Sequence, residues 1–181
     1  NNGTLWVCGA DELIATSVDG GNTWTVKHNA KNGSLLLTVG FANEQFGYAA
    51  GTGGQVFITR DGGKTWDSAK APSQVVYEVA FSDEKHGIIH TPRDIYTTSD
   101  SGATWLPVKI DLVSKDLKGF SYVLNVVAPD ANQMAIVLSQ GNSSANAYKL
   151  FLSKDGGAKW VVSGIPSTGL GKLSSHGGEY W

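Results

Sequence analysis

The chain consists of short apolar stretches separated by turns. Stretches such as Leu35–Ala42 and Phe46–Gly51 are rich in aromatic and aliphatic residues and are bounded by Gly, Asn, Asp or Ser. This pattern is typical of β-strands joined by tight turns and does not suit a helical bundle. The predicted strands are Leu5–Gly9, Glu12–Ser17, Thr23–His28, Leu35–Ala42, Phe46–Gly51, Gln55–Arg60, Thr65–Ala69, Val75–Phe81, His86–Thr91, Asp94–Ser99, Thr104–Ile110, Ser121–Ala128, Gln133–Ser139, Tyr148–Ser153, Lys159–Ser163 and Lys172–Ser175, with another beginning at Glu179.

One turn pattern occurs four times. In each copy an Asp precedes a Trp by five residues, and a Gly follows the Asp by two. The Trp residues are 42, 39 and 55 positions apart, which is the interval of a four-stranded propeller blade. The residues of this pattern are Asp19, Gly21, Trp24, Asp61, Gly63, Trp66, Asp100, Gly102, Trp105, Asp155, Gly157 and Trp160.

Each residue of the pattern has a physical reason to be there. An Asp side chain accepts hydrogen bonds from backbone N–H groups a few residues on, Gly permits a positive φ, and Trp places a large apolar body between sheets. The pattern resembles the Asp-box, or bacterial neuraminidase repeat, Ser-x-Asp-x-Gly-x-Thr-Trp. The resemblance implies an all-β propeller of four-stranded antiparallel blades. In such blades the box joins the third and fourth strands, on the rim and away from the ligand-binding face.

The predicted strands form a single domain of four blades, at approximately 1–30, 35–69, 75–110 and 121–163, with a partial blade at 170–181. The first blade lacks its innermost strand. Either the tail fills that gap and closes a four-bladed ring, or the chain is part of a larger propeller of six to eight blades. We favour the larger propeller, because the chain ends in mid-pattern and the first blade lacks its first strand. Missing blades or a companion chain would then cover the open sheet edges.

One blade resembles a narrower family. Residues 46–66 look like the repeat of the photosystem II stability/assembly factor family and its non-photosynthetic relatives, and residues 86–89 repeat part of it. The resemblance implies a non-catalytic propeller that binds a protein or peptide. Photosynthetic members carry an arginine-rich patch, whereas Arg60 and Arg93 are isolated in this chain. The sequence therefore predicts the fold and an assembly-scaffold role, but not that patch.

Composition narrows the possible partners and cofactors. The formal net charge of −2 gives no general attraction for nucleic acid or anionic lipid. No apolar stretch approaches the ~20 residues of a membrane span. Cys8 is the only cysteine, which excludes an intrachain disulfide and a thiolate metal cluster. We therefore expect no cofactor and no metal.

Box-bearing propellers also include glycoside hydrolases, so an enzyme must be considered. Sialidases bind the substrate carboxylate with three arginines, and this chain has two. Xyloglucanases use two acidic residues across a cleft, and no acidic pair stands out by its spacing. The box aspartates recur once per blade, as a structural role requires, and each box offers too few carboxylates for calcium. We expect a non-catalytic scaffold, with a carbohydrate-active propeller, either hydrolase or lectin, as the alternative.

The candidate binding face is the end of the blades opposite the boxes, where the loops between second and third strands open. On residues 90–94, a local turn stabilised by Asp94 and a binding contact are the two interpretations. Long loops, including residues 106–122, also belong to this face. The candidate residues are Asp11, Glu12, Gln55, His90, Arg93, Asp94, Lys115 and Lys118. Glycosylation sequons occur at Asn2, Asn32 and Asn142, and we expect an extracytoplasmic location.

Overall fold

The computed structural model describes residues 3–108, 120–140, 148–164, 175–176 and 179–180, and every regular element among them is a β-strand. All pairings are antiparallel. The strands are β1 (Leu5–Cys8), β2 (Ile14–Ser17), β3 (Thr25–His28), β4 (Leu36–Phe41), β5 (Gly47–Gly51), β6 (Gln55–Thr59), β7 (Asp67–Lys70), β8 (Glu78–Phe81), β9 (Gly87–His90), β10 (Ile95–Thr98), β11 (Leu106–Pro107), β12 (Phe120–Val127), β13 (Met134–Gln140), β14 (Tyr148–Ser153), β15 (Val161–Gly164), β16 (Ser175–His176) and β17 (Glu179–Tyr180).

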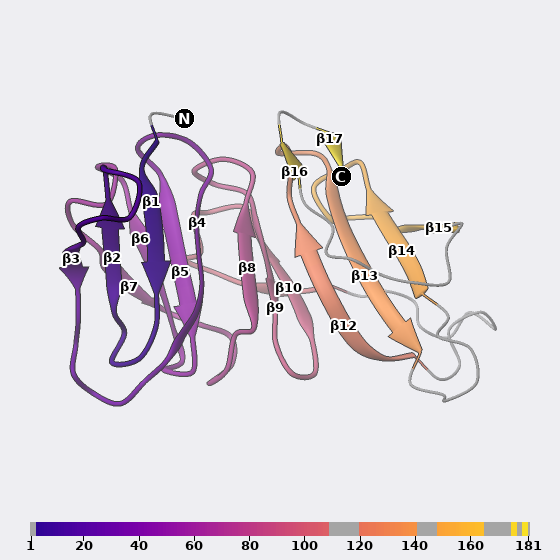
Figure 1. The fold of residues 1–181 in the computed structure, drawn as a ribbon. Helices are drawn as coiled ribbons and strands as arrows, with labels where there is room; N and C mark the ends of the chain where they lie inside the picture. Colours follow the sequence, from indigo (N-terminus) through magenta and orange to yellow (C-terminus); the bar gives the residue numbers. More distant parts are fainter. Residues whose placement is uncertain (1–2, 109–119, 141–147, 165–174, 177–178, 181) are drawn as a thin grey trace.

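The strands form sheets that follow one another side by side (Figure 1). Three sheets have four strands each, in chain order: β4 to β7, β8 to β11 and β12 to β15. Strands β4, β8 and β12 are the innermost strands, and β8 contacts both of the others. This arrangement is a partial propeller of several blades, as the sequence predicted.

The two ends of the described chain do not complete a ring. The first sheet contains only β1, β2 and β3, so β1 is its edge strand, as the missing first strand in the sequence predicted. The short strands β16 and β17 pair with each other and are not hydrogen bonded to β1 (Figure 1). The expected strand at 172–175 falls mostly outside the described residues. Completion of the propeller by further blades or a companion chain stays a prediction.

Strand boundaries differ from the predicted ones chiefly at the boxes. We expected the outer strands to begin at Thr23, Thr65 and Thr104, but β3, β7 and β11 begin two residues later. The reason is that the N–H and hydroxyl groups of these threonines bind the box aspartate, which keeps them in the turn. The predicted strand 104–110 is observed only as Leu106–Pro107; residues 109–110 lie outside the description.

The core lies between adjacent sheets rather than inside any one of them. One apolar cluster joins the first and second sheets through Ile14 and Phe57. A second joins the next pair of sheets through Phe46 and Phe81, whose rings meet edge to face. A third joins the β8–β11 and β12–β15 sheets. Each sheet therefore depends on its neighbours for burial, as expected for a repeat architecture.

Box tryptophans are covered only where a preceding sheet exists. Trp66 packs edge to face against Trp6 of the first sheet and against Phe41. Trp105 and Trp160 pack against the two later core clusters. Trp24 of the first sheet has no preceding sheet among the described residues, and it remains 44% exposed.

A pocket opposite the Asp-boxes

The blades have two distinct ends. The box turns join the third and fourth strands and lie at the upper end in Figure 1. The loops between second and third strands, and the starts of β4, β8 and β12, lie at the lower end. Because successive strands run in opposite directions, these two groups of loops cannot meet.

The four boxes share one hydrogen-bond pattern. In the first box, the N–H and the hydroxyl of Thr23 donate to the two carboxylate oxygens of Asp19, at 2.9 and 2.7 Å. Thr65 and Thr104 repeat both bonds to Asp61 and Asp100. In the last box Lys159 replaces the threonine, and only its N–H donates, at 2.8 Å. Each aspartate thus closes its own turn.

A Ser or Thr two residues before each aspartate is a second part of the turn that the sequence reasoning missed. In the second box the hydroxyl of Thr59 donates to Asp61 at 2.8 Å and accepts the N–H of Gly63, also at 2.8 Å. The side chains in the same position of the other boxes are Ser17, Thr98 and Ser153. The Ser that begins the repeat pattern was the sequence feature that could have identified this hydroxyl. Its hydroxyl satisfies an N–H group that would otherwise be unpaired.

These hydrogen bonds stabilise the ionised form of the box aspartates. The hydroxyl of Thr23, and then its N–H, lower the pKa of Asp19 to about 2. Thr65 lowers the pKa of Asp61 in the same way, and Thr104 that of Asp100. The pKa of each of these carboxyl groups is therefore lowered mainly by hydrogen bonds within its own turn.

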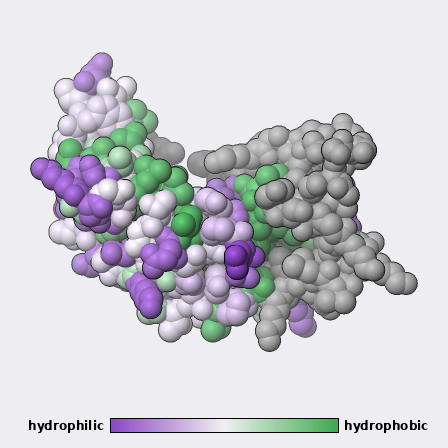
Figure 2. Space-filling model, turned by 90° about the horizontal axis from the view of Figure 1, so that it is seen from below, coloured by the Kyte–Doolittle hydropathy of each residue, from purple (hydrophilic) through white to green (hydrophobic). Residues whose placement is uncertain are grey.

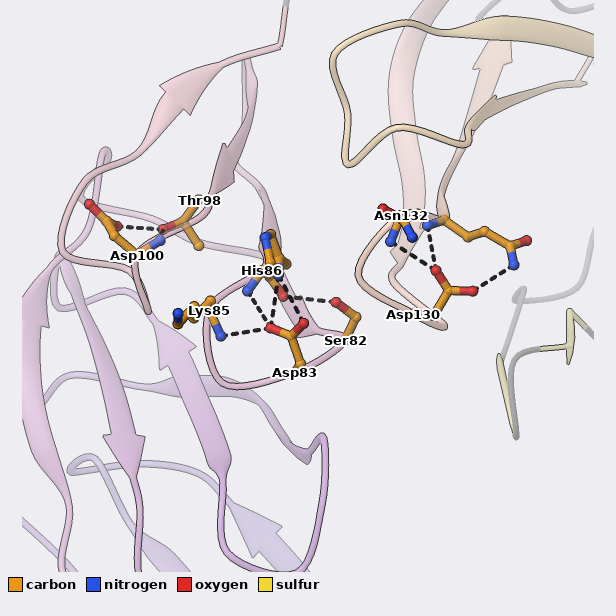
Figure 3. A network of polar contacts seen from close by, with 9 residues as sticks. Ser82, Asp83, Lys85, His86, Thr98, Asp100, Asp130 and Asn132 are labelled. Carbon is orange, nitrogen blue, oxygen red and sulfur yellow. Dashed lines mark hydrogen bonds and ion pairs between the residues drawn. The ribbon is translucent and has the colours of Figure 1, made fainter.

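The hairpins between first and second strands lie at the box end, and each is closed by an Asn or Asp side chain that accepts backbone N–H groups (Figure 3). Asp83 accepts the N–H groups of Lys85 and His86, both at 2.7 Å, and its carboxylate lies 2.8 Å from His86 Nδ1. Partial burial would raise the pKa of Asp83, but the hydrogen bonds from His86 and Lys85 lower it. Asn43 and Asp130 cap the equivalent hairpins.

Because each cap residue follows an innermost strand, the caps show which positions of these strands are equivalent from blade to blade. Counting six residues back from each cap reaches Leu37, Tyr77 and Leu124 on three successive blades. They are 40%, 51% and 43% exposed, although all three are large apolar residues on inner strands or immediately before one. Equivalent positions on neighbouring blades therefore place three apolar side chains on one surface.

These three side chains line a pocket of about 270 Å³. Its other lining residues are Thr38, Glu78, His90 and Val123. It opens at the lower end of the inner strands, opposite the boxes. Figure 2 views the molecule from that end, and apolar side chains gather there towards the middle of the face, beside polar ones.

Among the described residues, Glu78 is the only acidic one that lines the pocket, and neighbouring groups fix its orientation. Asn125 of the next sheet donates from Nδ2 to both carboxylate oxygens, at 2.8 and 2.9 Å, and Val126 N–H donates at 2.9 Å. These donors are neutral. No ion pair to Glu78 is found within the part of the chain that the structure describes.

His90 is paired with Glu78 across the β8–β9 ladder. It is 7% exposed, and its ring lies 5.4 Å from that of Tyr77. Burial lowers the pKa of His90 to about 4, so the imidazole is neutral near pH 7. The pocket therefore carries one negative charge from its lining residues.

Among the described residues, titratable groups line the pocket only from the third sheet, β8 to β11, and from Tyr77 immediately before it. At the positions of Glu78 and His90, the second sheet has Thr38 and Ala50. The fourth sheet has Asn125 paired with Val137. All three blades have an apolar residue at the position of Tyr77. Only the β8–β11 blade has a charged residue at the next position, Glu78.

Of the predicted face residues that the structure describes, only His90 lines the pocket. Arg93 and Asp94 are exposed and do not join it. Thr91 closes their turn, because its hydroxyl donates to the Asp94 carbonyl and accepts the Asp94 N–H. Residues 91–94 thus form a local turn, but the side chain that closes it is Thr91 and not Asp94. Gln55 is half-buried at the start of β6.

Glu12 is not an open binding residue. It lies in the β1–β2 turn with a φ of 57°, not in a strand, and it is 3% exposed. Its carboxylate lies 3.7 Å from His28 Nε2, and it packs against Gly53. Asp11, beside it, accepts the N–H of Gly33 at 2.9 Å and helps to fold the β3–β4 loop.

Most of the remaining predicted positions lie outside the residues that the structure describes. Lys115, Lys118, Asn2 and Asn142 lie outside the described residues. Asn32 is exposed between β3 and β4, and its side chain accepts the Ser34 N–H. Within the described ranges, no group of three or more His, Cys, Asp or Glu could hold a metal ion. The same ranges contain no helix that could cross a membrane.

The family model described as photosynthesis system II assembly factor YCF48 matches residues 29–160 of the chain. The chain belongs to this family. A curated relative is the chloroplastic photosystem II stability/assembly factor HCF136 of Arabidopsis thaliana, which is 39% identical over 57 residues. That match covers 30% of this chain and 14% of HCF136. The propeller and the assembly-factor repeat predicted from the sequence are thus confirmed.

Solved structures agree on the fold. A structure of YCF48 bound to D1 peptide matches with a TM-score of 0.53 at 20% identity, over 71% of this chain and 39% of that one. An ancestral GH74 enzyme matches with a TM-score of 0.60 at 15% identity, over 90% of this chain and 24% of the enzyme. Because the identities are low and the chain spans less than half of each relative, these matches establish the fold alone.

Proposed function

We propose that the chain is a non-catalytic propeller that binds a protein or peptide through the pocket opposite the boxes and acts as an assembly scaffold. The observation that carries this proposal is the alignment of Leu37, Tyr77 and Leu124 at equivalent inner positions. Exposed apolar side chains gathered at a hollow are typical of interaction sites. Membership of the YCF48 family, and the peptide-bound structure of a YCF48, support the same class of ligand.

A carbohydrate-active propeller is the second candidate, because GH74 enzymes share the fold. Tyr77 supplies the aromatic ring that such a site uses. Glycoside hydrolysis commonly needs two carboxyl groups facing the scissile bond, about 5 to 9.5 Å apart. Within the described part of the chain, Glu78 is the only carboxylate of the pocket lining, and Asn125 and Val126 already donate hydrogen bonds to it. This composition favours binding over hydrolysis.

The test is a selection of random 12-residue peptides displayed on phage, followed by affinity measurement with labelled synthetic peptides. We expect selected peptides to bind the natural chain, and Leu37→Asp to weaken them at least about tenfold, because it places a charge on the apolar wall. Val18→Asp is the matched control, since Val18 is exposed in the first box at the other end.

The rival outcome is equally specific. If the chain hydrolysed xyloglucan or a chromogenic glycoside, and Glu78→Gln abolished this activity, the protein would be an enzyme and not a scaffold. Binding on a glycan array that Leu37→Asp abolishes, with no peptide selected, would indicate a lectin.

An extracytoplasmic location belongs to the same proposal. Asn32 lies exposed in its loop, so a glycan has access to it. Expression through a eukaryotic secretory pathway should add a glycan at Asn32, so intact mass should fall by one glycan in Asn32→Gln. An unmodified Asn32 would remove this support.

A further inference from the structure

We infer that the pocket recognises a lysine or arginine side chain carried between apolar residues of the bound peptide. This inference rests on the proposed function and names the chemistry of its ligand. It depends on three features of the pocket: an oriented carboxylate, apolar walls and a small volume.

The first feature is the charge of Glu78. Its carboxylate is held from the side of the fourth sheet by Asn125 Nδ2 and Val126 N, both neutral donors. A carboxylate has about four lone-pair sites, so three donated hydrogen bonds leave room for another donor. Because no cation among the described residues is paired with Glu78, binding of a positive group would not first require an ion pair to break.

The neighbouring histidine does not supply the missing positive charge. Burial keeps His90 neutral above about pH 5, since its pKa is lowered to about 4. Among the described residues, the pocket lining contains no lysine or arginine. An anionic ligand would therefore meet the charge of Glu78 with no cation from the described lining to offset it, and a metal ion would find one carboxylate there where several oxygen ligands are needed.

The second feature is the apolar wall around this charge. Leu37, Tyr77 and Leu124 surround the pocket from three blades. Lysine and arginine bury their methylene stems along apolar surface while the charged end reaches a polar group. The ring of Tyr77 adds a face for cation–π contact. Apolar neighbours of the basic residue would cover the exposed parts of the leucines.

The third feature is size. A volume of about 270 Å³ lies below the range of about 300–1,000 Å³ common for small-molecule sites. It suits one long side chain rather than a cofactor or an oligosaccharide. The oriented carboxylate also loses little freedom on binding, which favours affinity.

The experiment compares three fluorescein-labelled nonapeptides of Gly and Ser with central Leu-Lys-Leu, Leu-Met-Leu or Leu-Glu-Leu. Fluorescence anisotropy with the natural chain should give at least about tenfold tighter binding of the lysine peptide than of the methionine peptide, the scale of a close charge pair. The glutamate peptide should bind weakest.

Two variants assign this preference to Glu78. Glu78→Gln keeps an acceptor for Asn125 and Val126 but removes the charge, so the lysine and methionine peptides should bind equally. Glu44→Gln, an exposed position at the box end, should keep the preference. If Glu78→Gln fails to fold by circular dichroism, Leu124→Lys provides the test, because it adds a positive charge at an exposed position.

The outcomes separate the two proposals. Equal binding of the lysine and methionine peptides by the natural chain overturns the cation inference, while loss of both in Leu37→Asp still supports peptide binding. A lysine preference that persists in folded Glu78→Gln, or in Leu124→Lys where Glu78→Gln does not fold, also overturns it. Absence of binding by all three peptides at millimolar concentration overturns the inference, and the display selection then decides the proposed function independently.

Discussion

The two ends of the blades differ in what is repeated. At the box end, four turns repeat the same aspartate, glycine and hydroxyl positions with nearly the same hydrogen-bond lengths. At the opposite end, equivalent positions change from Thr38 to Glu78 to Asn125. Repetition marks residues that each blade needs in order to fold. A position that changes between blades is free to take a chemical role, and the charged residue of the pocket, Glu78, occupies such a position beside the repeated apolar one.

The largest expected effect is at the glycine of the second box. Gly63 has a φ of +81°, and a Cβ there would lie 2.1 Å from the Trp6 ring of the neighbouring sheet. Gly63→Ala should therefore destabilise the chain by at least about 3 kcal/mol, through overpacking and backbone strain together. Urea denaturation followed by tryptophan fluorescence measures the change.

Gly20→Ala is the matched control for that substitution. Gly20 has a similar φ of +73°, but a Cβ there meets nothing within 4 Å. Gly20→Ala should lower the free energy of unfolding by about 1–2 kcal/mol, from backbone strain alone. Equal losses in the two variants would show that the contact with Trp6 does not contribute.

The second prediction is that the two ends of the blades lose stability in different pH ranges. The folded chain holds the His90 pKa at about 4, below the ordinary value of 6.5, so the unfolded chain binds more protons between these values. Stability should fall as the pH is lowered from about 6.5 to about 4, by up to about 3 kcal/mol. His90→Gln should remove this slope.

The box carboxylates titrate in a lower window. Their pKa values lie below the ordinary 3.8, so the stability they contribute is present above that value and is lost as the pH falls towards about 2 for Asp19. Asp19→Asn should flatten the curve only there. A His90→Gln chain whose stability still falls between pH 6.5 and 4 would contradict the assignment.

The third prediction concerns the hydroxyl that completes each box. Thr59 is 1% exposed, and Thr59→Val keeps its shape while leaving the Gly63 N–H without its acceptor. Loss of a buried hydrogen-bond partner should cost about 2 kcal/mol in urea denaturation. Thr25→Val, in exposed β3, serves as the control and should change stability little. Similar effects at both positions would remove the special role of Thr59.

The smallest expected effect is a gain. Ser101 has a φ of +64° at the position where the other boxes have Gly20, Gly62 and Gly156. Ser101→Gly should stabilise the chain by about 0.5–1 kcal/mol, because glycine adopts this conformation without strain. Ser101→Ala should give no gain. A thermal unfolding midpoint that falls in the glycine variant would refute this interpretation.

The periodicity of the sequence was sufficient to predict the fold, because the box is a local structure. Its aspartate, glycine and threonine lie within five residues of one another, so their contacts follow from spacing alone. The missing strand of the first sheet was predictable for the same reason. Exact strand starts were not, because the threonine after each glycine bonds to the aspartate instead of extending the strand.

The candidate site was predicted less well, because it is formed by residues far apart in the sequence. His90 was selected, but as part of a loop with Arg93 and Asp94 rather than as a buried side chain beside Glu78. Glu12 was expected on the surface and is buried against Gly53. Leu37, Tyr77 and Leu124 appeared to be ordinary strand residues. The available signal was their constant distance of six residues from the cap of each first hairpin.

The sequence by itself determined the repeat, the box chemistry and the all-β propeller, since these depend on contacts between residues close together in the chain. Only the tertiary structure decided which apolar side chains stay exposed on the inner strands and which carboxylate stands among them. The Glu78–Asn125 contact joins positions 47 residues apart on two different sheets. Such a contact exists only when neighbouring blades pack at a fixed distance, and spacing along the chain does not encode that distance.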